Sequence, residues 1–286
     1  MENNLFKQSA KLMKENLMVI QPLFFWVLVM MFAMMPLAAK QSVDLGFIFT
    51  VAVVALCFTA FLAGWYNCVK YTVSLKNRTY ETPEEHNKAQ FEILKNFFPG
   101  VGEYILPVTI STLIYGILGY GVFELYRYFS MKVFFAENLP QEFIKIVNFG
   151  TQAEITQYLQ NNFSDSQLKI MLLLLFGGFC VYFLFNIFVL WFAPAIFYYS
   201  KNPIKAIYHA VIFTFKNFKS SLLIVLVMFV LNLLISFTNV FLGNNFLAFI
   251  PMLLTFLYIM YYVITVFLYY ESKTQNSGNN GAECIG

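Results

Sequence analysis

The sequence predicts an all-α, polytopic membrane protein with six transmembrane helices, arranged as three hairpins that are each preceded by a cytoplasmic amphipathic helix. Three observations predict this fold class. Hydrophobic residues make up 59% of the chain and charged residues only 12%, whereas about a quarter of the residues in soluble proteins are charged. The apolar residues gather in charge-free runs long enough to cross a bilayer, which takes about 20 residues. Short segments that carry Lys and Arg separate these runs.

The charge-free runs place the spans in order. The six predicted spans lie near residues 17–39, 45–69, 104–123, 170–199, 221–241 and 246–270. The third, bounded by Glu103 and Glu124, is the shortest, and Pro99, Gly100 and Gly102 are expected to break the surface helix before it. The polar turn Gly243 to Asn245 divides the charge-free run Ser220 to Tyr270 into the last two spans. A cleaved signal peptide is the competing interpretation of the first run, but a signal h-region has only about 7 to 15 residues.

Residues 1–271 are expected to form one membrane domain with a single large insertion. This insertion, residues 124–169, is expected to be extracytoplasmic and to contain short helices around Pro140 to Asn148 and Thr151 to Leu159. It is the candidate docking region for a protein partner. Residues 272–286 are rich in Asn, Gly and Ser, and this composition predicts a disordered cytoplasmic tail.

The segment Asn202 to Phe218 predicts a helix that lies along the membrane surface. Asn202 is a good N-cap, and Pro203 suits the first helical position, where a missing N–H costs nothing. Apolar residues recur at helical spacing on one face, and cationic residues next to them can reach anionic lipid. The predicted apolar face holds Ile204, Ile207, Val211, Phe215 and Phe218, and the candidate lipid-interface residues are Lys201, Lys205, His209, Lys216 and Lys219.

Two other segments predict helices of the same kind. Residues 1–16 form a weakly amphipathic basic lead-in. Further along, Thr82, Pro83 and Glu85 have the pattern of an N-cap, a first-turn proline and a capping-box glutamate. The helix that they begin is expected to carry Phe91, Leu94 and Phe98 on its apolar face.

The three surface helices end in a common short pattern. A Lys is followed directly, or after one residue, by Asn and then by Leu or Phe, and a span begins there. The Asn residues are Asn16, Asn96 and Asn217. This pattern predicts a threefold internal repeat of a surface helix and a hairpin. The alternative is that any cytoplasmic linker tends to place Lys and an aromatic residue at the lipid interface.

The distribution of positive charge predicts the orientation. If both termini are cytoplasmic, the inner segments hold thirteen of the eighteen Lys and Arg residues and the outer segments hold five. The positive-inside rule therefore favours six spans with both ends in the cytoplasm.

The passage from Ala193 to Phe218 also carries a family resemblance. Ala193, Pro194 and Ala195 close a span, Asn202 to Ala206 open a surface helix, and Lys216, Asn217 and Phe218 lead into the next span. This layout resembles uncharacterised six-span bacterial membrane proteins of the YciC type, and it is similar to the membrane portion of some glycerophosphodiester phosphodiesterases. The resemblance implies the fold and a bacterial inner membrane, and it transfers no catalytic residue.

The spans offer few groups for chemistry. They contain no charged or histidine residue in their interiors, which disfavours proton coupling. Asn186 and Asn232, near the middles of the fourth and fifth spans, are candidates for an intramembrane polar contact, since an unpaired amide in hydrocarbon is costly, and each is a candidate partner for the other. A substrate site at these residues is the alternative. Gly116, Gly119, Gly177 and Gly178 predict close helix approach.

These observations predict a protein without catalytic activity. No motif for a cofactor, a metal or nucleic acid is present, so none of these is expected as a ligand. The leading hypothesis is a protein that organises or senses the bilayer, or scaffolds partners, through basic interfacial helices that bind anionic lipid head groups. The alternative is a transporter, a pore or a lipid-scrambling component for a neutral or lipid-like substrate.

Overall fold

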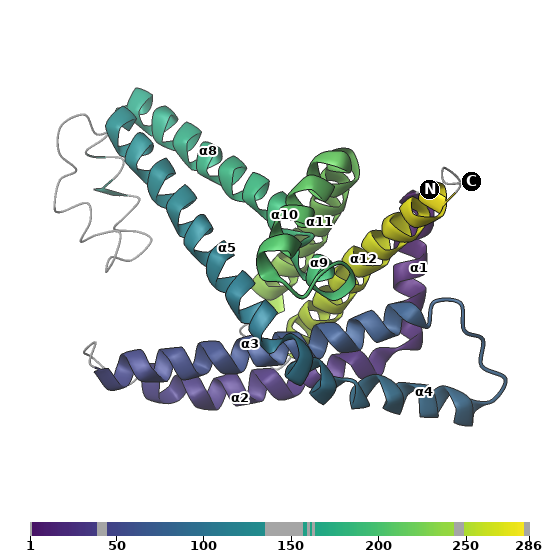
Figure 1. Cartoon of the computed structure of the whole chain (residues 1–286). Helices are drawn as coiled ribbons and strands as arrows, with labels where there is room; N and C mark the ends of the chain where they lie inside the picture. The colour runs from purple at the N-terminus through teal and green to yellow at the C-terminus, as the bar shows by residue number, and fades with distance from the viewer. Residues whose placement is uncertain are drawn as a thin grey trace. The chain divides into compact units, whose positions relative to one another are not determined.

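The computed structural model of the chain describes residues 2–38, 45–134, 157–158, 161, 164–242 and 249–282. The regular structure in these ranges is helical, so the all-α prediction is confirmed there (Figure 1). The elements are α1 (Glu2–Glu15), η1 (Leu17–Ile20), α2 (Gln21–Ala38), α3 (Leu45–Ser74), α4 (Pro83–Lys95), α5 (Phe97–Phe134), α8 (Asp165–Val189), α9 (Phe192–Tyr198), α10 (Pro203–Lys216), α11 (Phe218–Leu242) and α12 (Phe249–Ala282).

Several of these helices are long and apolar enough to cross a membrane. Within the described ranges there are five such segments: Gly46–Ser74, Pro83–Ser130, Leu168–Tyr198, Phe218–Thr238 and Phe249–Gln275. A sixth is reached if the bent pair Asn4–Glu15 and Leu17–Met31, whose halves meet at 82°, counts as one span. The helices therefore suit a membrane location, with five or six crossings by length and composition.

The helix of the third predicted span is much longer than residues 104–123. α5 has 38 residues and runs without a break through Pro99 and Gly100, so the predicted helix break at those residues is wrong. The break falls at Asn96 instead. Pro99 is the third residue of α5, where the backbone N–H has no partner within the helix, so its missing donor costs little. The same helix extends to Phe134, into the segment expected to be an insertion.

The fourth predicted span is divided between two helices. α8 ends at Val189 and α9 begins at Phe192. Pro194 accounts for the interruption, because its ring would clash with the carbonyl of Leu190 in a continuous helix and its nitrogen donates no hydrogen bond. The predicted helices at Pro140 to Asn148 and Thr151 to Leu159 lie outside the described residues, apart from residues 157–158.

The last helix continues beyond the predicted span. α12 runs to Ala282, so residues 272–282, for which the composition predicts disorder, are helical. Two side chains at the start of this segment donate hydrogen bonds to backbone carbonyls of the preceding turn of α12. Ser272 Oγ donates to the Tyr269 carbonyl at 2.8 Å, and Thr274 Oγ1 donates to the Tyr270 carbonyl at 3.0 Å. Residues 272–282 thus continue the helix beyond Glu271, the residue that pairs with Lys76.

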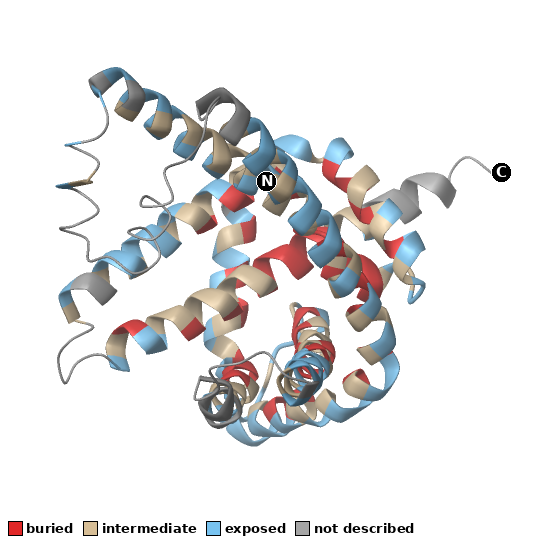
Figure 2. Ribbon diagram, turned by 90° about the vertical axis from the view of Figure 1, so that its left-hand side faces the viewer, coloured by how far each residue is buried: buried red, intermediate tan, exposed pale blue. Residues whose placement is uncertain are grey.

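The chain forms two compact units. Unit 1 comprises Met1–Leu113 with Ile187–Gly286, and unit 2 comprises Ile114–Asn186. In unit 1 the buried residues, red in Figure 2, lie where α1, α3, α9, α10 and α12 pack together. α2 and α3 also expose large apolar side chains, such as Phe25 and Phe49. In a membrane protein, side chains of this kind face lipid.

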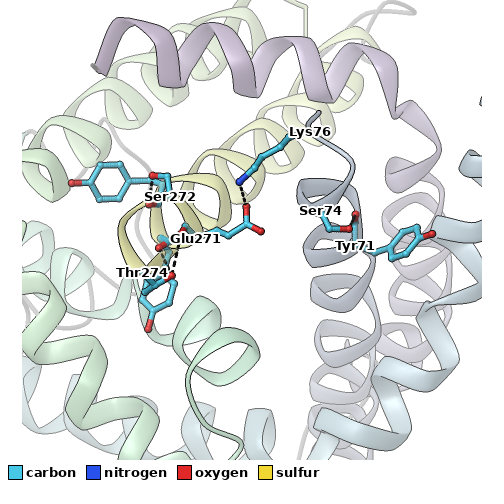
Figure 3. Close-up of polar contacts among 8 residues, drawn as sticks. Tyr71, Ser74, Lys76, Glu271, Ser272 and Thr274 are labelled. Carbon is cyan, nitrogen blue, oxygen red and sulfur yellow. Dashed lines mark hydrogen bonds and ion pairs between the residues drawn. The ribbon is translucent and has the colours of Figure 1, made fainter. Parts of the chain in front are cut away.

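Specific polar contacts hold unit 1 together. Trp65 Nε1 donates to the Val19 carbonyl at 3.0 Å and joins α3 to η1. After the end of α3, Lys76 Nζ lies 2.5 Å from Glu271 Oε2 on α12, as Figure 3 shows. Both side chains of this ion pair are largely buried, at 24% and 10% exposure. The pair therefore fixes α12 against the end of α3 although the two residues are far apart in sequence.

In unit 2, α5 and α8 approach closely at glycines. A Cβ at Gly178 would lie 2.9 Å from the Tyr126 ring, and a Cβ at Gly119 would lie 3.1 Å from the Phe185 ring. Tyr126 also donates a hydrogen bond from its hydroxyl to the Leu174 carbonyl. Gly177 and Gly178 thus accommodate Tyr126, whereas a Cβ at Gly116 would meet no atom of another described element within 4 Å.

Candidate functional site

Helix α10 begins as its sequence predicts. Asn202 Oδ1 accepts hydrogen bonds from the backbone N–H groups of Ile204 at 3.1 Å and Lys205 at 3.2 Å, and Pro203 occupies the first turn. The cap satisfies two amides that have no partner within the helix. It also places Lys201 just before the helix and Lys205 in its first turn, both exposed to the surroundings.

The side of α10 that packs on the protein is not its most apolar side. Ala206, Ala210, Phe213 and Thr214 are buried and form the docked face. The most exposed part of the predicted apolar face, together with Tyr208, forms a second stripe: Ile204 is 72% exposed, Tyr208 69% and Phe215 66%. Of the rest of that predicted face, Phe218 is exposed and Ile207 and Val211 are half-buried. Small residues such as Ala206 and Ala210 allow α10 to approach its neighbouring helices closely. The larger apolar side chains of the second stripe do not pack on the protein and can contact another apolar surface.

The cationic residues of α10 divide between two environments. Lys205 and Lys216 are exposed, as is Lys219 at the start of α11 (Phe218–Leu242). His209 is half-buried: its ring stacks on Tyr199 with centroids 3.9 Å apart, and its Nδ1 lies 2.8 Å from the Tyr270 hydroxyl. Burial, with the nearby charge of Lys216, lowers the pKa of His209 below its usual value of 6.5. The structure therefore places His209 in the packing of α10 on α12, and not among the exposed cations.

Helix α4 repeats the arrangement of α10. Thr82 caps it by accepting a hydrogen bond from the Glu85 N–H at 3.2 Å. Glu85 Oε2 accepts from the Glu81 N–H, so the reciprocal bond of the expected capping box goes to the residue before the cap. Ala89, Gln90 and Ile93 are its buried residues. Of the predicted apolar face, Phe91 and Phe98 are exposed and Leu94 is half-buried.

The three asparagines between a short helix and the helix that follows have the same local geometry. In each, the side-chain amide donates to the carbonyl four residues earlier: Asn16 to Leu12 at 2.9 Å, Asn96 to Glu92 at 2.8 Å, and Asn217 to Phe213 at 3.0 Å. These bonds satisfy carbonyls at the helix end. The internal repeat remains a prediction, but the matching residues serve the same purpose in all three places.

The structure also brings the candidate lipid-interface residue Lys201 together with residues that the sequence did not single out. Lys70 near the end of α3 donates to the Tyr104 hydroxyl of α5 at 3.2 Å. Lys201 Nζ lies 2.7 Å from Glu103 Oε1 and 5.7 Å from the centre of the Tyr104 ring. A Lys just after Trp65 and Tyr66 signals an interfacial position, but these partners, which lie more than thirty residues away, leave no local pattern in the sequence.

The two candidate intramembrane asparagines lie in different units. Asn186 is half-buried, and its amide donates to the Tyr182 carbonyl of its own helix at 2.8 Å. Asn232 on α11 is exposed. Asn186 thus has an intrahelical partner of the kind that lets a polar side chain sit in an apolar helix.

Unit 2 contains an apolar groove between α5 and α8. Its volume is about 590 Å³, within the range of small-molecule sites. The lining residues include Gly119, Phe123, Tyr126, Arg127, Val181 and Phe185. Arg127 contributes the charged side chain of this lining and is paired with Glu124.

The described ranges contain no group of three or more His, Cys, Asp or Glu residues that could hold a metal ion. Among the described residues, two candidate ligand-binding surfaces are the cationic and apolar surface of α10 and the apolar groove of unit 2. Comparison with protein-family models, with curated proteins and with solved structures finds no match.

Proposed function

We propose that this protein is a membrane protein without catalytic activity that organises or senses the bilayer, or scaffolds partners, by binding anionic lipid head groups through basic interfacial helices. The observation that carries the proposal is the exposed surface of α10. Ile204, Tyr208 and Phe215 lie exposed on a helix that also exposes Lys205 and Lys216. An exposed apolar stripe beside cations is the pattern of a helix lying in a membrane interface.

The energies involved favour a lipid partner for this surface. Each Lys near an anionic membrane surface contributes about 1 kcal/mol of attraction. The apolar stripe adds the transfer of its side chains out of water, about 25 cal/mol per Å². α10 is docked through Ala206 and Ala210, so its stripe is available without any change in the fold.

The proposal also includes the membrane topology of the chain and the membrane in which it resides. We propose six spans in three hairpins, with the short helices and both termini in the cytoplasm, as the Lys and Arg distribution favours. A bacterial inner membrane and kinship with YciC-type proteins rest on the sequence pattern of residues 193–218. Accessibility labelling of a cysteine placed at Lys205 tests the orientation, and labelling from the outer side contradicts it.

Charge reversal on α10 tests the lipid-binding proposal. The triple variant Lys205→Glu, Lys216→Glu, Lys219→Glu should retain less anionic phospholipid per protein after purification, measured by mass spectrometry of extracted lipid. The matched control is the triple Arg variant, which keeps the charge. Both should remain in the membrane fraction after carbonate washing. Equal lipid retention by the Glu and Arg variants, both inserted, contradicts the proposal.

A second candidate function is a transporter, pore or lipid-scrambling component for a neutral or lipid-like substrate, and the groove of unit 2 favours it. The groove is apolar and of ligand size. Reconstituted protein should then move labelled lipid between leaflets, and Val181→Trp, which fills the groove, should stop that movement. Leu173→Trp, at an exposed position outside the groove lining, is the control. Absence of lipid movement with the unaltered protein dismisses this candidate.

A further inference from the structure

Two lysines from distant parts of unit 1 lie against one tyrosine ring. Lys70 Nζ is 5.5 Å from the centre of the Tyr104 ring, and Lys201 Nζ is 5.7 Å from the same centre. Lys70 is also 5.8 Å from the centre of the Tyr198 ring. Both lysines are thus held by cation–π contacts, which position an ammonium group without neutralising it.

The neutralisation of these charges is incomplete. Glu103 pairs with Lys201 at 2.7 Å and interacts electrostatically with Lys70. In the described part of the chain, the hydrogen-bond acceptor of Lys70 is the uncharged Tyr104 hydroxyl at 3.2 Å. An ammonium group has three donors, so Lys70 has two more to give. Two lysines and one glutamate leave one formal positive charge at a half-buried position, where an unsatisfied charge is costly.

The position of the cluster suits the headgroup level of a bilayer. Lys70 ends the long apolar run of α3, four residues after Tyr66, and Trp65 and Tyr66 are residue types that favour the membrane interface. Lys201 comes just before α10, and its side chain is 60% exposed, so the cluster is open to the surroundings. The Tyr104 ring is buried beneath the two ammonium groups, and Lys201 presents the exposed cationic head of the cluster.

We propose that Lys70 and Lys201, held on Tyr104, bind the phosphate group of one phospholipid headgroup. A phosphate offers several strong acceptor oxygens, so it can accept from both ammonium groups and supply the missing negative charge. This inference rests on the proposed function and narrows it from general attraction for anionic lipid to a discrete phosphate site. Glu103 holds Lys201 in the absence of lipid and competes with the phosphate for it.

Native mass spectrometry of the full chain in detergent tests this site. The probes are phosphatidylglycerol, oleate as an anionic lipid without phosphate, and inorganic phosphate as a competitor. Unaltered protein should bind one phosphatidylglycerol more tightly than oleate, and Lys70→Met should weaken that binding by about tenfold or more, the factor expected for a lost charge-assisted hydrogen bond. Glu103→Gln should strengthen it, because Lys201 is released from its carboxylate. If Lys70 had only a structural role, Glu103→Gln should not increase the affinity for phosphatidylglycerol.

The controls separate this inference from the proposed function. Lys205→Met removes one exposed charge of α10 and should change binding of the single tight lipid by less than about twofold. Equal weakening by Lys70→Met and Lys205→Met overturns the discrete site and leaves the α10 proposal intact. Displacement of phosphatidylglycerol by inorganic phosphate at equal concentration overturns a lipid source for the phosphate.

Folding of the variants is checked separately by thermal unfolding without added lipid. Lys70→Met keeps the apolar stem and removes an incompletely paired charge, so its unfolding temperature should equal or exceed that of the unaltered protein. If Lys70→Met fails to fold, Tyr104→Phe, which keeps the ring and removes the hydroxyl that positions Lys70, replaces it. Normal folding with unchanged lipid affinity in that variant also counts against the site.

Discussion

Helices α1 and α10 are both basic and both have a Lys and an Asn at their C-terminal ends, but they differ in which apolar side chains they bury. α1 packs against α12 and buries Leu5 and Leu12. α10 buries Ala206, Ala210 and Phe213 and leaves Ile204 exposed. The difference shows that apolar periodicity identifies a face but not its partner, because in a membrane protein that face can meet either protein or lipid.

The largest effect is expected from shortening a docked leucine of α1. Leu12→Ala should lower the free energy of unfolding by about 2–5 kcal/mol, because it leaves a cavity against α12. Ile204→Ala on α10, at a mostly exposed side chain, should change it by less than about 0.5 kcal/mol. Both are measured by denaturant unfolding in one detergent. A large loss from Ile204→Ala would mean that the exposed stripe of α10 packs on protein.

The converse substitution should damage α10. Ala210→Leu inserts a bulky side chain into the fully buried docked face and should cost about 1–3 kcal/mol by overpacking. Ala10→Leu on α1, at an exposed position, is the matched control and should be near neutral. The same unfolding measurement checks both. Equal tolerance of the two would show that α10 is not docked through its alanines.

Local signals predicted the helices well, and non-local packing accounts for what was missed. A few neighbouring residues determine a helix cap or boundary, so these can be predicted from sequence. The structure shows the caps at Thr82 and Asn202 and the helix boundaries at Asn96 and Asn217. The docked face of α10 could not be predicted in the same way, because Ala206 and Ala210 become buried only when other helices, chiefly α9, pack against α10. The ion pair between Lys76 and Glu271 is likewise invisible until the fold brings the two together.

The same distinction separates correct and incorrect helix ends. Pro99 and Gly100 were expected to break the helix before the third span, but the break lies at Asn96. Pro99 is the third residue of α5, and Pro194 is likewise the third residue of α9, whose separation from α8 lies at residues 190–191. A proline is tolerated in the first turn of a helix, so in both places the helix breaks before the proline and not at it.

The pH dependence of stability tests whether His209 belongs to the docked side of α10. Burial lowers its pKa in the folded protein below 6.5, so the unfolded chain binds a proton more readily than the folded one. The contribution of His209 is therefore fully present above pH 6.5 and is lost as the pH falls through the lower pKa of the folded state. Thermal unfolding followed from pH 7.5 down to pH 5 should show this loss, and His209→Gln should reduce it.

The groups around His209 limit what else could cause that slope. Lys216 on α10 lies near the ring, and Tyr199 and Tyr270 pack against it. His86 on α4 is the remaining histidine, and His86→Gln is the control for it. If His86→Gln removes the slope and His209→Gln does not, then His209 titrates freely and belongs with the exposed cations after all.

The smallest effect on stability is expected from substituting single exposed lysines of α1 and α10. The same substitutions should distinguish the two helices most clearly by their effect on lipid binding. Lys205→Gln and Lys11→Gln should each change the free energy of unfolding by less than about 0.5 kcal/mol, because both side chains are exposed. Their effects on lipid should differ. α1 has no exposed large apolar side chain among its described residues, whereas Ile204 and Tyr208 lie beside Lys205.

A headgroup attracted to Lys205 therefore meets apolar side chains that reach the acyl region below it, while one attracted to Lys11 meets only a polar surface and a competing carboxylate, Glu15, at 3.7 Å. Lys205→Gln should weaken retention of anionic lipid by about 1 kcal/mol, and Lys11→Gln by less. Lipid titration in mixed micelles measures both. A larger loss from Lys11→Gln would reverse the comparison and make α1, with its buried leucines, the membrane-binding helix.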